Sequence, residues 1–136
     1  MPEISGGNAP CFRVLIVEDS PMLAKTLGWM VELLGHEVKT APDGQSALDI
    51  ALTFLPDVVL LDIGLQGGMN GYELCRRMRA EPALQHCVFV AQTGWTQPEH
   101  RRKAQEAGFD HHLAKPVELD TLEELFASLR SNAVAN

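Results

Sequence analysis

The sequence has 136 residues, of which 46% are hydrophobic and 21% charged, and its formal net charge is -7. This length suits one domain with its own core, and the acidic balance argues against direct nucleic-acid binding, which depends on lysine and arginine. Since no apolar run approaches the roughly 20 residues of a membrane helix, and the first residues lack the basic start and apolar core of a secretory signal, we expect a cytoplasmic protein without membrane contact.

Strand and helix patterns alternate along the chain after a Gly- and Pro-rich start at residues 1–11 that we expect to be disordered. The run FRVLIV (12–17) is continuously apolar, as in a strand buried on both faces of a parallel sheet. A helix follows, with Ser20 placed to cap it and Pro21 in its first turn. The remaining expected strands are 36–41, 56–63, 87–93 and 110–116, and the remaining expected helices are 43–54, 70–84, 97–108 and 118–130.

This alternation predicts the α/β class, with a five-stranded, doubly wound parallel sheet covered by helices on both faces. A single domain is expected over residues 12–130, followed by a short C-terminal tail at 131–136. The cysteines Cys11, Cys75 and Cys87 are odd in number and lack paired spacing, so we expect reduced thiols.

Polar residues gather where the expected strands end. In a doubly wound sheet, ligands bind outside the carboxyl ends of the strands, at the point where the strand order reverses. All of the following residues should therefore emerge on one rim: Glu18 and Asp19 after the first strand, Asp62 at the end of the third, Gln92, Thr93 and Gly94 at the fourth, and Lys115 and Pro116 at the fifth.

Three carboxylates on one rim need a cation, since two unit charges about 4 Å apart repel by about 4 kcal/mol at an effective dielectric near 20. Oxygen ligands suit Mg²⁺ better than zinc, and the cysteines and histidines lack zinc-like spacing. His111 and His112 should point to opposite faces of a strand and so cannot easily share an ion. With the ammonium of Lys115 and the hydroxyl of Thr93, the rim would suit a phosphoryl group.

Four segments carry a resemblance to a known family. VLIVEDSP, VVLLDIGL, the Thr-Gly after the fourth strand and GFDHHLAKP resemble the signature segments of bacterial response-regulator receiver domains, in the right order and over about residues 12–130. The resemblance implies a flavodoxin-like fold and a Mg²⁺-dependent phosphoacceptor of two-component or phosphorelay signalling, not an enzyme, that assists its own phosphorylation and dephosphorylation. It also implies a sensor histidine kinase or histidine phosphotransfer protein as donor, and a switch in protein–protein interactions as output.

The resemblance implies roles for the acidic residues. Asp62 matches the phosphoryl acceptor, Asp19 would ligate Mg²⁺ directly, and Glu18 would support the metal through water. The backbone carbonyl of Gly64 would be a further metal ligand.

The phosphoryl oxygens would be contacted by Thr93 and Lys115, and Pro116 would follow a cis peptide bond that aims the lysine. Thr93 is also expected as a switch residue together with His112, which stands where the family often has Tyr or Phe. The remaining residues expected to bind phosphate are Ile63, Gly64 and Gly94.

Other functions stay open at this point. A small Mg²⁺-dependent phosphatase or nucleotide-binding enzyme could use a similar sheet, although no GxxxxGK[ST] or GxGxxG loop and no lid segment is evident. A degenerate receiver used only for protein contacts disagrees with the complete set of acids, threonine and lysine. The chain could act alone or come from a hybrid kinase.

Two hypotheses concern the rim loops. The resemblance implies that the side chain of Trp95 borders the phosphoryl pocket. Because Trp95 is apolar and Gly64 has no side chain, these two positions offer no acid or amide to orient an attacking water, which favours a long-lived phosphoryl state. Gln66 stands where the family commonly has proline, and two glycines follow it, so residues 66–69 should be mobile without Mg²⁺ and ordered with it.

Overall fold

The computed structural model describes residues 11–65, 68–94 and 98–135, with the side chains of 98–100 and 132–135 left aside. Five parallel strands form one sheet in the order β2-β1-β3-β4-β5, which confirms the predicted doubly wound α/β fold. The strand order reverses direction at β1, as the predicted ligand rim requires. The strands are β1 (Arg13–Val17), β2 (Glu37–Ala41), β3 (Val58–Asp62), β4 (Val88–Thr93) and β5 (His111–Ala114).

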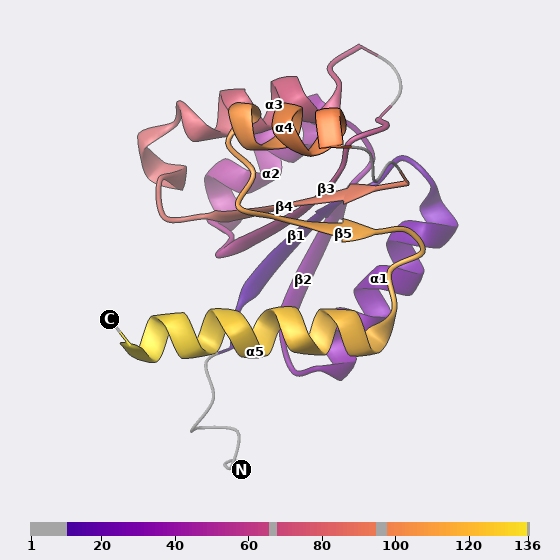
Figure 1. Cartoon of the computed structure of the whole chain (residues 1–136), viewed down its shortest axis with the longest axis vertical. Helices are drawn as coiled ribbons and strands as arrows, with labels where there is room; N and C mark the ends of the chain where they lie inside the picture. The colour runs from indigo at the N-terminus through magenta and orange to yellow at the C-terminus, as the bar shows by residue number, and fades with distance from the viewer. Residues whose placement is uncertain (1–10, 66–67, 95–97, 136) are drawn as a thin grey trace.

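Helices cover both faces of the sheet, with α1 and α5 on one face and α2, α3 and α4 on the other (Figure 1). Residues Ser20, Asp43 and Asn70 cap the first three helices by accepting hydrogen bonds from backbone N–H groups, as side chains of these types commonly do. The helices are α1 (Pro21–Leu33), α2 (Gly44–Phe54), α3 (Gly71–Arg79), α4 (Pro98–Ala107) and α5 (Leu119–Ala135), and a 3₁₀ turn, η2, spans Pro82–Leu84.

Two helix ends differ from the prediction, whereas the other predicted boundaries agree within two residues. The helix expected over 70–84 ends at Arg79, because Pro82 has no N–H to continue it and begins the separate turn η2. The last helix continues from its expected end at Arg130 to Ala135, since no glycine or proline interrupts the sequence there. It thus enters the segment expected to be a tail, while the domain limits at 12 and 130 stay predictions.

The core lies on both faces of the sheet, which is why the central strands are apolar throughout. Alternate residues of β1 point to opposite faces: Val14 and Ile16 pack beneath α1 and α5, and Leu15 and Val17 pack beneath α2 and α3. All residues of β3 are buried. Because both faces are fixed by packing, the strand ends are held in register at the rim.

The cysteines are free thiols, as predicted from their number and spacing. Cys75 and Cys87 are buried, and burial raises the pKa of Cys75 to about 12 and that of Cys87 to about 11. Both thiols therefore stay protonated near neutral pH and act as small core side chains.

The guanidinium of Arg79 ties the end of α3 to the chain before β5. Its Nε and Nη2 donate to the carbonyl of Gly108 at 2.9 and 2.7 Å, and Nη2 lies 2.6 Å from Asp110 Oδ2. Nη1 donates to the carbonyl of Cys87 at 3.2 Å, and the group lies 4.4 Å from the centroid of the Phe89 ring. A lysine could not make all of these contacts, because they use the planar fork of arginine.

Replacing Arg79 with methionine should lower the free energy of unfolding by about 2 kcal/mol, because two backbone carbonyls and a carboxylate lose a charged donor. Urea unfolding measures the change. The matched control is Arg77→Met, since the contact of Arg77 among the described residues is an exposed pair with Glu73 at 3.0 Å, whose loss should cost less than about 0.5 kcal/mol. Equal losses in both variants would contradict this account of the clamp.

His36 is a buried imidazole at the opposite end of the sheet from the rim. Its Nδ1 accepts a hydrogen bond from the backbone N–H of Phe12 at 3.1 Å, and its ring centroid lies 4.3 Å from that of Phe126. Burial lowers the pKa of His36, and the positive charge of Arg130 lowers it further. Protonation of Nδ1 would remove the bond from Phe12, so the folded protein favours neutral His36.

This lowered pKa predicts a pH-dependent stability. Because the pKa of His36 is lower in the folded state than its ordinary value of 6.5, the stabilisation is complete above pH 6.5 and is lost as the pH falls towards the folded pKa. The free energy of unfolding, measured in urea between pH 7.5 and 5, should fall less steeply for His36→Asn, which keeps an acceptor but does not titrate. Parallel pH profiles for the two proteins would refute the assignment.

Candidate functional site

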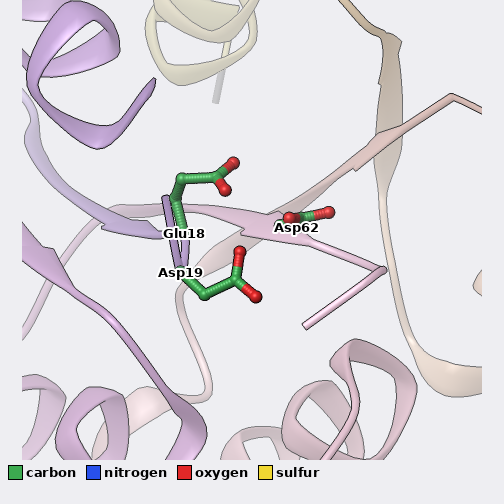
Figure 2. A group of neighbouring side chains, drawn as sticks. All are labelled: Glu18, Asp19 and Asp62. Atoms are coloured by element: carbon green, nitrogen blue, oxygen red, sulfur yellow. The ribbon is translucent and has the colours of Figure 1, made fainter. Parts of the chain in front are cut away.

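Three carboxylates meet at the carboxyl ends of neighbouring strands. Glu18 and Asp19 follow β1 directly, and Asp62 is the last residue of β3 (Figure 2). One carboxylate oxygen of each residue lies within 4.8 Å of those of the other two. The predicted convergence of these three residues on one rim is therefore what the fold produces.

Lys115, the residue directly after β5, joins this cluster. Its Nζ lies 2.8 Å from Asp62 Oδ1 and 4.0 Å from Glu18 Oε1. The same Oδ1 of Asp62 also accepts the backbone N–H of Gly64 at 2.9 Å. Asp62 is 4% exposed, so these donors hold a buried carboxylate in a fixed orientation.

Glu18 is the most deeply buried of the three acids, at 3% exposure. Its Oε2 accepts the backbone N–H of Ser20 at 3.1 Å. Burial raises the pKa of Glu18, and the negative charge of Asp62 raises it further, while the bond from Ser20 and the charge of Lys115 oppose the rise. Burial and mutual repulsion thus disfavour the charged form of these carboxylates, and a bound cation would stabilise that form.

The donor set fits a hard divalent cation such as Mg²⁺. The donor atoms are carboxylate oxygens, which Mg²⁺ prefers. Glu18 and Asp62 are buried, whereas Asp19 is half-exposed, so water can reach the site and complete a coordination shell. Within the described ranges this is the one cluster of three or more acidic, histidine or cysteine side chains close enough to share an ion. A zinc site would need nitrogen or sulfur ligands that this cluster lacks.

The other predicted phosphate-binding residues lie on the same rim. Thr93 ends β4 and is buried, and its carbonyl accepts the backbone N–H of Lys115 at 2.9 Å, which fixes the start of the lysine side chain. The backbone N–H of Ile63 donates to the carbonyl of Gln92 at 3.1 Å. Gly94 follows Thr93 and is exposed. These positions surround Asp62 on the side of β4.

The peptide bond between Lys115 and Pro116 is cis, as the resemblance implied. His112 lies in β5 opposite Ala91, and loss of solvent contact lowers its pKa, with the positive charges of Arg101 and His111 adding to the effect. Its part in a switch stays a prediction. The hypotheses on Trp95 and on Gln66 and Gly67 fall on residues outside those that the structure describes.

One residue at the rim had no role assigned from the sequence. Gln92 pairs with Asp62 in the register of β3 and β4, and its side chain is 1% exposed. The sequence does carry a signal for this buried position. Gln92 stands two residues after Val90 in a mainly apolar strand, so its amide lies on the same face as Val90, which packs against α1 and α5.

Comparison with known proteins identifies the family. Residues 14–127 match the sequence model described as "Response regulator receiver domain". The chain belongs to this family. Relatives of this receiver domain include the response regulator PleD of Caulobacter vibrioides, 34% identical over 88% of the chain and 25% of PleD. Another is the sensor histidine kinase RcsC of Salmonella typhimurium, 34% identical over 84% of the chain and 12% of the kinase. The chain thus spans a quarter or less of these curated relatives.

Solved structures of receiver proteins have the same fold. Chemotaxis protein CheY4 of Vibrio cholerae superimposes with a TM-score of 0.82 at 27% identity, over 88% of this receiver domain and 98% of that chain. The receiver domain of sensor histidine kinase PA1611 from Pseudomonas aeruginosa gives a TM-score of 0.80 at 26% identity, over 90% and 99% of the two chains. That structure holds a magnesium ion coordinated in the active-site cleft.

Over the described residues, no helix is both long enough and apolar enough to cross a bilayer.

Proposed function

We propose that this receiver domain accepts a phosphoryl group on Asp62 from a phosphohistidine donor in a Mg²⁺-dependent reaction. The observation that carries the proposal is the position of Lys115 Nζ, 2.8 Å from Asp62 Oδ1, beside two further carboxylates. A carboxylate held between an ammonium group and a cation site is oriented for attack on a phosphorus atom, and the charge that develops there meets a positive group already in place.

Glu18, Asp19 and Asp62 would hold the ion, together with the backbone carbonyl of Gly64 and water. When bound, Mg²⁺ neutralises charge on the transferring phosphoryl oxygens and on the acidic cluster. The ion would also offset the desolvation of the buried Glu18 carboxylate and its repulsion by Asp62, so metal binding would favour the charged cluster that phosphoryl transfer needs.

In the transfer, a carboxylate oxygen of Asp62 forms the new O–P bond while the P–N bond of the phosphohistidine breaks. The electron pair of the broken bond stays on the imidazole nitrogen of the donor, so no redox partner is required. The ammonium of Lys115 moves from Asp62 Oδ1 to a phosphoryl oxygen, and the hydroxyl of Thr93 donates to another. The backbone N–H groups near Gly64 and Gly94 would bind the remaining oxygens.

Phosphorylation would act as a switch, because it adds nearly two negative charges to a buried rim. Inward rotation of Thr93 would move the chain after β4, with His112 on β5 responding. The donor would be a sensor histidine kinase or a histidine phosphotransfer protein. Because the phosphoryl group would come from a kinase that uses ATP, the domain would act in the cytoplasm. The domain would assist its own phosphorylation and dephosphorylation and would not turn over a separate substrate.

The proposal is tested with acetyl phosphate or phosphoramidate, with and without Mg²⁺, and intact-protein mass spectrometry. The wild type should gain one phosphoryl group only with Mg²⁺, and Asp62→Asn should gain none. Asp49→Asn is the matched control, because Asp49 is an exposed aspartate on α2. A wild type that stays unmodified, or a modification that persists in Asp62→Asn, would overturn the proposal.

A further inference from the structure

Four polar side chains form a row across the rim on the face of the sheet that packs against α1 and α5. Val58, Leu60 and Val90 of β3 and β4 belong to the core on that face, so the residues two positions beyond Leu60 and Val90 point the same way. These are Asp62 and Gln92, which pair in register. The row runs in strand order from Glu18 through Asp62 and Gln92 to Lys115.

Gln92 differs from the rest of the row in its hydrogen bonding. Its side chain is 1% exposed, and within the described part of the chain its Nε2 has no hydrogen-bond partner. Buried donors without an acceptor are rare in folded proteins and cost free energy. An apolar residue would fit the strand without this cost. We therefore expect another state of the domain in which the Gln92 amide nitrogen has a hydrogen-bond acceptor.

The side chain of Lys115 crosses a neighbouring strand to make its contacts. Because β4 lies between β5 and β3, the lysine side chain crosses β4 to place Nζ 2.8 Å from Asp62 Oδ1 and 4.0 Å from Glu18 Oε1. Glu18, Gln92 and Lys115 line one cavity of about 340 Å³, whose other walls are mainly apolar residues of α1 and the chain after β5. These three residues therefore border one space whose walls are mainly apolar.

Movement of Lys115 would take the ammonium away from one oxygen of Glu18. Oε2 of Glu18 is bonded to the backbone of Ser20, whereas Oε1 is the oxygen that faces Lys115. If the ammonium follows a phosphoryl group on Asp62, the buried carboxylate would keep the bond from Ser20 and the bound ion, but Oε1 would lose its neighbouring ammonium. Gln92 lines the same cavity, and among the described residues its buried Nε2 is a donor without a partner.

We propose that Gln92 is a positioning residue for phosphoryl transfer, whose amide donates to the Glu18 carboxylate when Lys115 leaves it for the phosphoryl group. This inference rests on the proposed phosphorylation of Asp62. The amide has no partner before transfer and gains one during it, so it favours the transition state and the phosphorylated state over the unphosphorylated state. Glu18 is thereby held in place for the metal after its lysine neighbour has moved.

The test compares the wild type with Gln92→Met, because methionine is similar in length and unbranched but has no donor. At saturating Mg²⁺ and fixed phosphoramidate, the rate of phosphoryl uptake should fall about tenfold, the effect of one lost hydrogen bond to a charged group. The Mg²⁺ concentration at half-maximal rate should change by less than about twofold, because Lys115 still faces Glu18 before transfer. Without Mg²⁺, the thermal midpoint of Gln92→Met should equal or exceed that of the wild type, since an unpaired buried amide is removed.

Gln45→Met is the matched control, because Gln45 is exposed on α2, where its amide contacts Asp49, and it should change neither rate nor stability. A wild-type rate in Gln92→Met would overturn the inference. A lower rate accompanied by a lower thermal midpoint and weaker Mg²⁺ dependence would also overturn it, since that pattern indicates a structural role. These outcomes require that the wild type is modified on Asp62, whereas a wild type that takes up no phosphoryl group overturns the proposed function and this inference together.

Discussion

Lys115→Met should reduce the rate of phosphoryl uptake by about 100-fold, comparable to the loss of one preorganised donor at a reacting oxygen. The ammonium lies 2.8 Å from Asp62 Oδ1 and 4.0 Å from Glu18 Oε1, so it faces two of the three carboxylates of the cluster. Methionine keeps most of the aliphatic stem, so the packing of the lysine over β4 is preserved while the charge is removed. The rate is measured with phosphoramidate at saturating Mg²⁺.

The same substitution should strengthen Mg²⁺ binding, because the ammonium and the ion compete for the carboxylate charge. Titration calorimetry on the unphosphorylated protein measures this affinity. Lys39→Met serves as the control for net charge, because Lys39 is exposed on β2 and belongs to none of the contacts at the rim. If Lys115→Met weakened Mg²⁺ binding or left the rate unchanged, the assigned role of the lysine would be wrong.

Gly71→Ala should lower the free energy of unfolding by about 3 kcal/mol, the upper range for forcing extra atoms into a packed site. A methyl group on Gly71 would lie 2.7 Å from the Cα of Ile63 and 2.8 Å from the carbonyl oxygen of Asp62. Both are backbone atoms at the end of β3, so relief of the contact must shift the residue that carries the acceptor carboxylate. Phosphoryl uptake should therefore fall together with stability.

Gly28→Ala provides the comparison within the same chain. Gly28 lies inside α1, and a methyl group there would meet no atom within 4 Å. Alanine should raise the free energy of unfolding by about 0.5–1 kcal/mol, because it loses less backbone entropy on folding than glycine. Urea unfolding of both variants gives the two changes, and a stable Gly71→Ala protein with normal phosphoryl uptake would contradict the structural account of this connection.

Much of the fold followed from the sequence because its rules are local. The apolar strands and the periodic helices predict the layers of the fold. The rule that parallel strands end at one edge predicts that Glu18, Asp19 and Asp62 lie close together, as the structure shows. The cis peptide before Pro116 came from the family resemblance. These features depend on pattern and topology, which a single sequence records well.

Features that depend on side-chain geometry between distant segments could not be predicted in this way. No local pattern indicates that Arg79 reaches the carbonyl of Gly108 or that the amide of Gln92 lies buried beside the path of Lys115. The predicted end of α3 at residue 84 is also wrong. The apolar period continues past Arg79, but the backbone cannot continue a helix through Pro82. Such contacts are decided by packing in three dimensions.

The central claim is that Asp62 carries the phosphoryl group. Its most direct test is to phosphorylate the wild type with phosphoramidate and Mg²⁺, reduce the acyl phosphate with borohydride, and locate the reduced side chain by peptide mass spectrometry. The account predicts that homoserine appears at position 62, only when Mg²⁺ was present, and that Asp19 and Glu18 remain unmodified. Reduction at another acidic residue, or stable phosphorylation of a histidine with position 62 unchanged, would contradict it.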